Sequence, residues 1–243
     1  HGSFSRNGME VIIVMDEPSE KEGVVALLRE YPFINWKVII NEHEHEWRNP
    51  AKALNVGIRN ARFRYILVVG PDSELHTDII SIFREKSLFY RNTFFIGQVA
   101  FVDHTFDACA TGKEPCVFFP YGSIFAEAAA FKQVRGYNEH FSAWGGDDDE
   151  IRARLEYAGW KKMFVPEARL LHREADSAGL ISRAEKAKAL PAELKRKILL
   201  PECSIANDES WGTDFDDVLY AGDNNPFFYE QLRAYLSQFE GYE

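Results

Sequence analysis

The sequence has few cysteines and no long hydrophobic run. Its three cysteines, Cys109, Cys116 and Cys203, lack CxxC spacing and are too sparse for a disulfide framework. A reducing compartment therefore fits best, and we expect a cytoplasmic location. No apolar run approaches the roughly 18 to 20 residues that span a bilayer, and no basic start followed by an apolar stretch marks a signal peptide. We therefore predict no transmembrane segment.

Basic residues are also in the minority. There are 28 Lys and Arg against 38 Asp and Glu, which gives a formal net charge of −10. A negative field repels phosphate backbones and anionic lipids, so we expect no nucleic-acid partner and no membrane binding through bulk charge. No GxGxxG follows an expected strand, and no glycine-rich basic loop lies near the first strand. These absences argue against a dehydrogenase and against a sugar nucleotidyltransferase.

The residues that are abundant indicate a folded chain. Apolar residues make up 46% and aromatic residues 14% of the 243 residues, enough for one large domain or one and a half. In the first 90 residues, β-branched runs alternate with helical patterns of about ten residues, which is typical of β-α-β units. The expected strands are 10–15, 36–40 and 65–69, and the expected helices end at Tyr31 and cover 51–61, the second capped by Asn49. This pattern predicts an α/β fold with a mostly parallel central sheet, helices on both faces, and ligands beyond the carboxyl ends of the strands.

Beyond residue 90 the pattern becomes mixed. Strand-like and helical segments follow each other without regular alternation, and residues 200–225 are rich in turn formers. The expected strands are 94–102, 116–119 and 163–165, and the expected helices are 148–159, 182–199 and 227–239. We therefore predict a mixed second half followed by a helical C-terminal tail.

A first candidate site follows the strand that ends at Val69. The segment Gly70-Pro71-Asp72-Ser73-Glu74 places a carboxylate where an α/β sheet binds its ligand, and such a carboxylate can hold a divalent cation. The alternative is a turn in which Asp72 or Ser73 caps a helix beginning near Leu75.

The most informative segment is Trp144-Gly145-Gly146-Asp147-Asp148-Asp149-Glu150. Asp147 as N-cap and Glu150 as its partner in a capping box would explain two of the four acids. Four neighbouring carboxylates repel one another, which raises their pKa values as a general base requires. The two glycines allow close approach of a ligand, and Trp144 offers a flat face for a sugar ring. We therefore favour a functional site here.

Histidines provide the remaining candidates. His172 lies just beyond the expected strand at 163–165, and a mixed carboxylate and imidazole site favours Mn²⁺ or a similar ion over Ca²⁺. His43 and His45 have a spacing that would allow a zinc pair, but no further ligands are evident nearby. We interpret those two as part of a solvent-exposed face.

In order along the chain, these segments resemble the family-2 glycosyltransferases of GT-A fold over residues 9–175. Val11 to Asp16 resembles the second strand of the family and its nucleotide-contacting Asp, although Glu17-Pro18-Ser19 replaces the usual turn. The segment 49–57 resembles the family's helix with Ala-Arg-Asn-x-Gly, although Leu54 stands in place of the arginine. Residues 70–72 occupy the place of the family's metal-binding Asp-x-Asp, although Gly70 stands in place of the first Asp. Trp144 to Asp149 is close to the Trp-Gly-Gly-Glu-Asp-Asp of β-1,4-galactosyltransferases, and 165–172 resembles the closing Val-Pro…His.

The resemblance implies a metal-dependent, inverting transferase that moves a sugar from a nucleotide sugar to a hydroxyl of a glycan or other carbohydrate acceptor, with a role in polysaccharide biosynthesis. The expected donor is a UDP-sugar. Asp148 would be the general base, and Asp72 and His172 would hold Mn²⁺ or Mg²⁺. The implied donor contacts are Asp16, Asn55, Pro71 and Asp72. The implied acceptor contacts are Tyr121, Trp144, Gly145, Gly146 and Asp147.

The same resemblance suggests the domain organisation. A GT-A domain would cover 1–175, with a nucleotide-binding half at 1–90 and an acceptor-binding half at 91–175, and a helical extension would cover 176–243. The alternative function is a non-catalytic module that binds a nucleotide or a glycan, because Gly70 departs from the metal-binding motif. The sequence does not define an oligomeric state.

Overall fold

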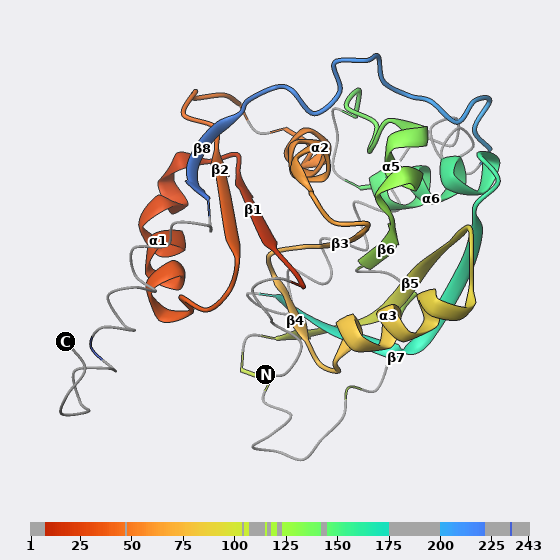
Figure 1. Ribbon diagram of the computed structural model, residues 1–243, viewed down its shortest axis with the longest axis horizontal. Coiled ribbons are helices and arrows are strands. Elements are labelled where there is room, and N and C mark those ends of the chain that lie inside the picture. Colours follow the sequence, from red (N-terminus) through yellow and green to blue (C-terminus); the bar gives the residue numbers. More distant parts are fainter. Residues whose placement is uncertain are drawn as a thin grey trace. The chain divides into compact units, whose positions relative to one another are not determined.

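The protein, seen in Figure 1 as a computed structural model, forms two compact units. The structure describes residues 8–46, 48–103, 105–106, 115, 118–120, 123–141, 145–174, 200–221 and 234. The first unit comprises His1–Trp47, Ala53–Phe63 and Gly212–Glu243, and the second comprises Arg48–Lys52 and Arg64–Trp211. The predicted boundaries after residues 90 and 175 both fall inside the second unit.

The first unit is built on a three-stranded sheet of order β1-β2-β8. Its elements are β1 (Val11–Met15), η1 (Pro18–Glu20), α1 (Lys21–Glu30), β2 (Trp36–Ile40), most of α2 (Ala51–Asn60) and β8 (Asp217–Ala221). Successive side chains of a strand point to opposite faces, so β2 contributes to two cores. Val38 packs with Leu28 of α1, whereas Ile39 packs with Val56 of α2. Helices therefore cover both faces of this sheet, as predicted.

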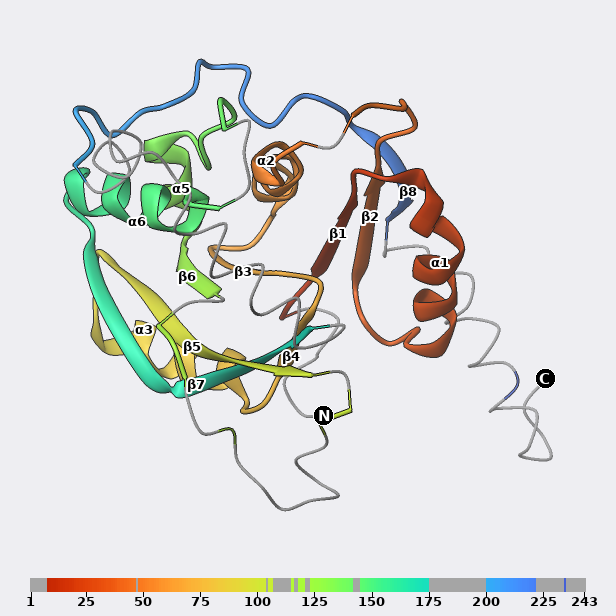
Figure 2. The same ribbon diagram turned by 180° about the vertical axis from the view of Figure 1, so that it is seen from behind.

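The second unit contains a five-stranded sheet of order β3-β6-β5-β7-β4 (Figure 2). Its elements are β3 (Tyr65–Val69), β4 (Ser73–Leu75), α3 (Ile79–Phe89), β5 (Thr93–Asp103), β6 (Ser123–Glu127), α5 (Ala128–Val134), α6 (Asp147–Tyr157) and β7 (Lys161–Glu174). The helix α3 packs on one face through Phe83, whose ring stacks on Phe125 at 5.4 Å between centroids. Phe94 and Ile124, on the other face, are also buried. The sheet therefore carries buried side chains on both faces.

The expectation of a mostly parallel sheet is wrong. Among the strand pairs of the described residues, only β1 with β2 and β5 with β7 are parallel. The other four pairs are antiparallel. The β-α-β pattern correctly predicted the pairing of β1 with β2, but β6 and β8 join their sheets from distant parts of the chain, which local periodicity does not reveal.

The local structure differs from the expectations at several positions. Ser73 begins a strand instead of capping a helix. The next helix starts at Ile79, and its N-cap is Asp78, whose side chain accepts a hydrogen bond from the Ser81 N–H at 3.1 Å. His172 lies inside β7, not after a short strand at 163–165. The turn-rich region 200–225 contains β8. The predicted helices at 182–199 and 227–239 lie outside the described residues except for residue 234, and no helix in the described part of the chain is long and apolar enough to cross a membrane.

Candidate active site

Asp72 and His172 meet at the β4 edge of the five-stranded sheet. Ser73 lies opposite His172 in the antiparallel pair of β4 and β7, and the carbonyl of Asp72 accepts from the Arg173 N–H at 3.1 Å. This register places the His172 Nε2 3.0 Å from the Asp72 Oδ2. The imidazole is 10% exposed and has its edge against Phe101, whereas the carboxylate is 45% exposed. The structure therefore brings together the two predicted metal ligands, which are far apart in sequence.

Gly70 makes room for this carboxylate. A Cβ atom at position 70 would lie only 2.7 Å from the Asp72 Oδ1. Contacts this short force one of the two groups to move, and the carboxylate is the more mobile group. Glycine at position 70, in place of the first aspartate of Asp-x-Asp, is therefore compatible with the conformation in which Asp72 contacts His172.

The Asp72 and His172 pair suits a divalent cation. The 3.0 Å separation is that of a hydrogen-bonded ion pair, and it is also the distance between two donor atoms at right angles on an octahedral ion, each at about 2.1 Å. A carboxylate together with an imidazole is a ligand set that suits Mn²⁺. Within the described ranges, no group of three or more His, Cys, Asp or Glu residues is placed to hold a metal. The pair can thus supply two ligands, and a cation there would need oxygen atoms of a bound ligand or water.

The acidic segment forms the first turn of α6, but none of its acids occupies the N-cap position. Gly146 is the N-cap residue, with φ of 89°, so the N-cap offers no side chain for a capping hydrogen bond. The Asp147 carboxylate accepts a hydrogen bond from its own backbone N–H. The predicted capping box of Asp147 and Glu150 is therefore wrong. Gly145, with φ of 86°, adopts the same left-handed region, which glycine favours. The N-cap position therefore does not explain why Asp147 and Asp148 are acids.

Two adjacent carboxylates at this helix tip have raised pKa values. Burial raises the pKa of Asp147 to about 6, the charge of Asp148 adds to the shift, and a hydrogen bond from the Asn49 side chain opposes it. Burial also raises the pKa of Asp148, while the nearby Arg152 guanidinium lowers it. Asn49 is 2% exposed, and its Oδ1 accepts from the Ala51 N–H at 2.9 Å, which confirms its predicted capping role. Both side chains are half-buried, and acids with such shifts are typical of functional sites.

A buried ion pair fixes the helix that carries these acids. Arg154, 1% exposed, donates from Nε and Nη2 to the two carboxylate oxygens of Glu150, each at 2.7 Å. It also donates to the carbonyls of Val134 and Gly136 at 2.8 Å, at the end of α5. Sequence reasoning missed this pair, although the i, i+4 spacing of Glu150 and Arg154 is a signal that predicts it. The pair locks α6 against α5 and so holds the acidic tip in place.

In the first unit, Asp16 belongs to a separate polar cluster at the ends of β1 and β2. The Asn41 Nδ2 donates to the Asp16 Oδ1 at 3.1 Å, and the His45 Nε2 lies 3.2 Å from the same oxygen. His43 is exposed, but the His45 and Asp16 side chains are each only 19% exposed. The expectation that both histidines lie on a solvent-exposed face is therefore wrong for His45.

The other predicted site residues are distributed as follows. Asn55 is fully buried in α2, and Pro71 is exposed in the turn before β4. Tyr121 and Trp144 lie outside the described residues. Asp16 and Asn55 belong to the first unit, and the Asp72 and His172 pair and the acidic tip belong to the second. A shared cleft for Asp148 and this pair stays a prediction.

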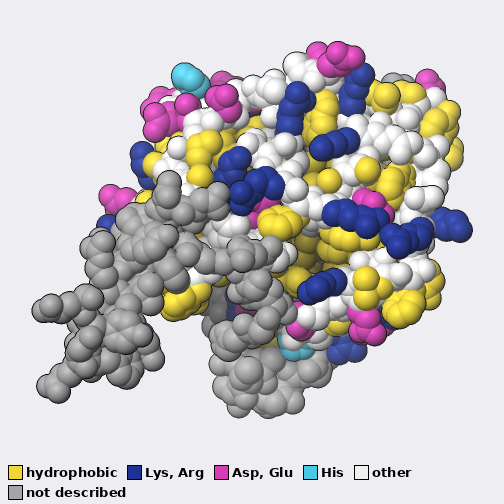
Figure 3. All heavy atoms as spheres, viewed as in Figure 1, with side chains coloured by type: hydrophobic (Ala, Val, Ile, Leu, Met, Phe, Trp, Pro, Cys, Tyr) yellow, Lys and Arg dark blue, Asp and Glu magenta, His cyan; other side chains and the backbone are white. Residues whose placement is uncertain are grey.

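The face seen in Figure 3 carries basic side chains despite the negative net charge. They stand between hydrophobic and uncharged groups and do not merge into one continuous basic surface. The net charge of the chain therefore does not predict which charged side chains this face carries.

Comparison with known proteins supports a glycosyltransferase fold. A family profile described as the N-terminal domain of galactosyltransferase matches residues 118–176. The mannosyltransferase PcManGT from Pyrobaculum calidifontis, solved with GDP-Man and Mn²⁺, is 16% identical with a TM-score of 0.52, covering 76% of this chain and 53% of its own. GalNAc-T7, solved with UDP, GalNAc and Mn²⁺, is 13% identical with a TM-score of 0.54, covering 94% and 50%. No curated protein matches significantly.

The two structures with TM-scores above 0.5 establish that this chain has the GT-A glycosyltransferase fold, and they confirm the predicted α/β fold class. The catalytic domain of Drosophila beta1,4galactosyltransferase 7, in complex with xylobiose, is 19% identical and covers 63% of this chain and 62% of its own. Its TM-score of 0.38 is too low to support a conclusion. The chain spans about half to two thirds of the length of these three proteins.

Proposed function

We propose that the protein is a metal-dependent, inverting glycosyltransferase that uses a UDP-sugar and a carbohydrate acceptor. The observation that carries the proposal is the pair of carboxylates with raised pKa values, Asp147 and Asp148, at a helix tip whose N-cap residue is a glycine. The GT-A fold and the profile match over 118–176, which includes this tip, support the same class of reaction.

In this proposal, Asp148 takes the proton from an acceptor hydroxyl. The acceptor oxygen forms a bond to the anomeric carbon from the face opposite the leaving group, and the bond from that carbon to the diphosphate breaks. The nucleoside diphosphate leaves with the electron pair, so a single displacement inverts the configuration. A base with a raised pKa is suited to this role, because its proton affinity lies nearer to neutral pH. Asp147 holds the acceptor, together with Gly145, Gly146, Trp144 and Tyr121.

Asp72 and His172 are the proposed ligands of Mn²⁺ or Mg²⁺. Such a cation, when bound, stabilises negative charge on a departing diphosphate as a Lewis acid. Asp16, with Asn55 and Pro71, is proposed to contact the nucleotide. PcManGT and GalNAc-T7 were each solved with a nucleotide or nucleotide sugar and Mn²⁺, which supports the choice of ligands to test.

The decisive experiment compares Asp148→Asn with Glu156→Gln. A general base is worth about 10² to 10⁴ in rate, so Asp148→Asn is expected to lose turnover on that scale while UDP binding in the presence of Mn²⁺ persists. Glu156 lies on the same helix but is exposed and paired with Lys162 at 2.7 Å, so its variant controls for loss of a carboxylate from α6 and keeps activity.

The outcomes separate the two functions considered for this chain. Turnover of a UDP-sugar that stops with EDTA and returns with Mn²⁺ supports the enzyme. Binding of UDP without any transfer or donor hydrolysis, over a broad panel of sugars and acceptors, supports the non-catalytic module instead. If Asp148→Asn weakens UDP binding as much as turnover, Asp148 acts in donor binding and the assignment as base is wrong.

A further inference from the structure

The cluster around Asp16 contains a histidine whose two ring nitrogens both face oxygen atoms. The His45 Nδ1 lies 2.7 Å from the Glu46 carbonyl oxygen. The His45 Nε2 lies 3.0 Å from the Asp16 carbonyl oxygen and 3.2 Å from the Asp16 Oδ1. His45 therefore bridges its own loop and the end of β1.

These contacts define the protonation of the ring. Carbonyl oxygens, and carboxylate oxygens in the ionised form, accept hydrogen bonds but cannot donate them. A neutral imidazole has one N–H, so either tautomer would leave a nitrogen lone pair facing an oxygen lone pair. Only the imidazolium donates from both nitrogens. The contacts therefore favour a charged His45 paired with a charged Asp16.

The partner of His45 is fixed from a second side. Asn41 continues β2, with its N–H donating to the Met15 carbonyl at 2.8 Å, and its Nδ2 donates to the same carboxylate oxygen that His45 contacts. The Oδ1 of Asp16 thus has donors from two elements. Two donors on one oxygen restrict rotation of the carboxylate, and a fixed acceptor loses less entropy when it binds a ligand.

We propose that His45 is a positioning residue for Asp16, which in its imidazolium form orients the carboxylate to accept the imide N–H of a uracil base. The proposal rests on the nucleotide-contacting role of Asp16 in the proposed function. The 2.7 Å contact of Nδ1 with the Glu46 carbonyl is shorter than the contacts of Nε2 with Asp16, so the neutral ring retains its proton on Nδ1. The Nε2 lone pair then faces the Asp16 Oδ1 and the carboxylate turns away. Uridine binding is then strongest when His45 is charged, and it weakens as the pH rises through the titration of His45.

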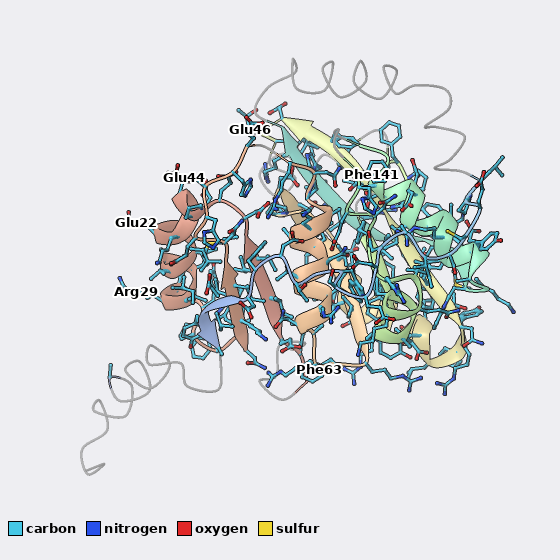
Figure 4. The ribbon with its side chains drawn as sticks, turned by 90° about the horizontal axis from the view of Figure 1, so that it is seen from above. Glu22, Arg29, Glu44, Glu46, Phe63 and Phe141 are labelled. Carbon is cyan, nitrogen blue, oxygen red and sulfur yellow. The ribbon has the colours of Figure 1, made fainter. Side chains whose placement is uncertain are left out.

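The charged groups around this cluster favour the imidazolium. Besides Asp16 at the end of β1, Glu44 and Glu46 lie on the same loop as His45 and are exposed (Figure 4). At the start of α1, Lys21 is paired with Glu42 at 3.6 Å, so its positive charge is offset. Glu17 precedes η1 and Glu20 ends it, and Arg48 follows His45 three residues along the chain. The acids named here still outnumber the bases, and nearby negative charge stabilises a protonated imidazole.

The test uses uridine, which has no diphosphate and so reports on the base site without a cation. Wild-type protein, His45→Gln and the exposed control His43→Gln are titrated with uridine and with UDP between pH 5.5 and 8.5. Affinity of the wild type and of His43→Gln for uridine is expected to fall about threefold to tenfold across this range. His45→Gln can still donate a hydrogen bond but cannot titrate, so its affinity should be independent of pH.

A second measurement reads the histidine directly. Long-range proton–nitrogen NMR spectra distinguish the imidazolium from the two neutral tautomers, and Asp16→Asn should make His45 lose its second proton at a lower pH. Melting curves of each variant check that it folds. An unchanged titration of His45 in Asp16→Asn overturns the inference, as does a pH dependence of uridine binding that survives in His45→Gln. If the wild type binds neither uridine nor UDP at any pH, both the proposed function and the inference are wrong. If UDP binds normally but either of the two overturning outcomes is found, only the inference is wrong.

Discussion

Replacement of Asp147 by asparagine is expected to stabilise the protein at neutral pH. Burial raises the pKa of Asp147 from 3.8 to about 6, so the folded state binds this proton more tightly than the unfolded state. The stability that this confers is complete below pH 3.8 and is lost as the pH rises through 6. An asparagine keeps the shape of the side chain without the buried charge, and it therefore avoids the loss.

The size of the effect follows from the shift. At about 1.36 kcal/mol per pKa unit, the cost of ionising Asp147 is at most about 3 kcal/mol at pH 8 and below about 1 kcal/mol at pH 4. Part of the cost is repulsion from Asp148, so a protein in which Asp148 is protonated would gain less. The same substitution should weaken acceptor binding, because Asp147 is a proposed acceptor contact. Gain of stability with loss of function is the usual result at an active site.

Urea denaturation followed by tryptophan fluorescence, at pH 4 and pH 8, measures this gain. Asp149→Asn, which removes a 38% exposed acid from the same first turn, also removes the ion pair with Arg152 at 3.7 Å and is expected to lose stability, so the wild type is the reference. The reasoning is refuted if Asp147→Asn is no more stable than the wild type at pH 8, or if its advantage is equally large at pH 4.

Two further substitutions test other parts of the structure. Gly70→Ala should weaken Mn²⁺ binding in calorimetric titration with little change in melting temperature, because its Cβ would displace the Asp72 carboxylate. Gly23→Ala is the control, because a Cβ there meets open space. Equal Mn²⁺ affinity in the two variants would contradict the prediction. Glu150→Gln leaves the Arg154 guanidinium buried without its charge partner and should cost about 3 to 5 kcal/mol in the free energy of unfolding, measured by urea denaturation. A loss below about 1 kcal/mol would mean that the pair does not hold the acidic helix.

The sequence predicted segments whose structure depends on near neighbours. The sequence predicts the strands β1, β2 and β3 at nearly their observed positions, because each is a short apolar run rich in β-branched residues. Asn49 was correctly expected to cap the next helix. These features depend on local periodicity and on a single side chain, both of which are visible in the sequence.

The length of β7 could not be predicted, because Pro166 in its middle looks like the end of a strand. The pairing with β5 steps from Ile96 opposite Phe164 to Gln98 opposite Arg169, so Pro166 lies in an irregularity where no ladder hydrogen bond needs its missing N–H. The Gln98 Nε2 donates to the Pro166 carbonyl at 2.6 Å. After this interruption the strand resumes and carries His172 to its position opposite Ser73.

Side-chain partners in the candidate site were predicted only in part. Asp72 and His172 were paired through a family resemblance, and the register of β4 with β7 places them together. The sequence does not reveal the contact of His45, because its partner, Asp16, directly follows β1 and the contact depends on the loop after β2. The absence of an N-cap side chain on α6 was equally invisible, since Gly146 takes the position that Asp147 was expected to fill.

The meeting of Asp72 and His172 on neighbouring strands also has a consequence for assembly. Any ion that bridges them would cross-link two positions about one hundred residues apart and close a loop that contains β5, β6, α3, α5 and α6. Because the unfolded chain does not bring these two side chains together, the ion would bind the folded sheet selectively and raise its melting temperature with concentration. The abundance of a manganese-like ion during synthesis would then help to decide how much of the chain matures.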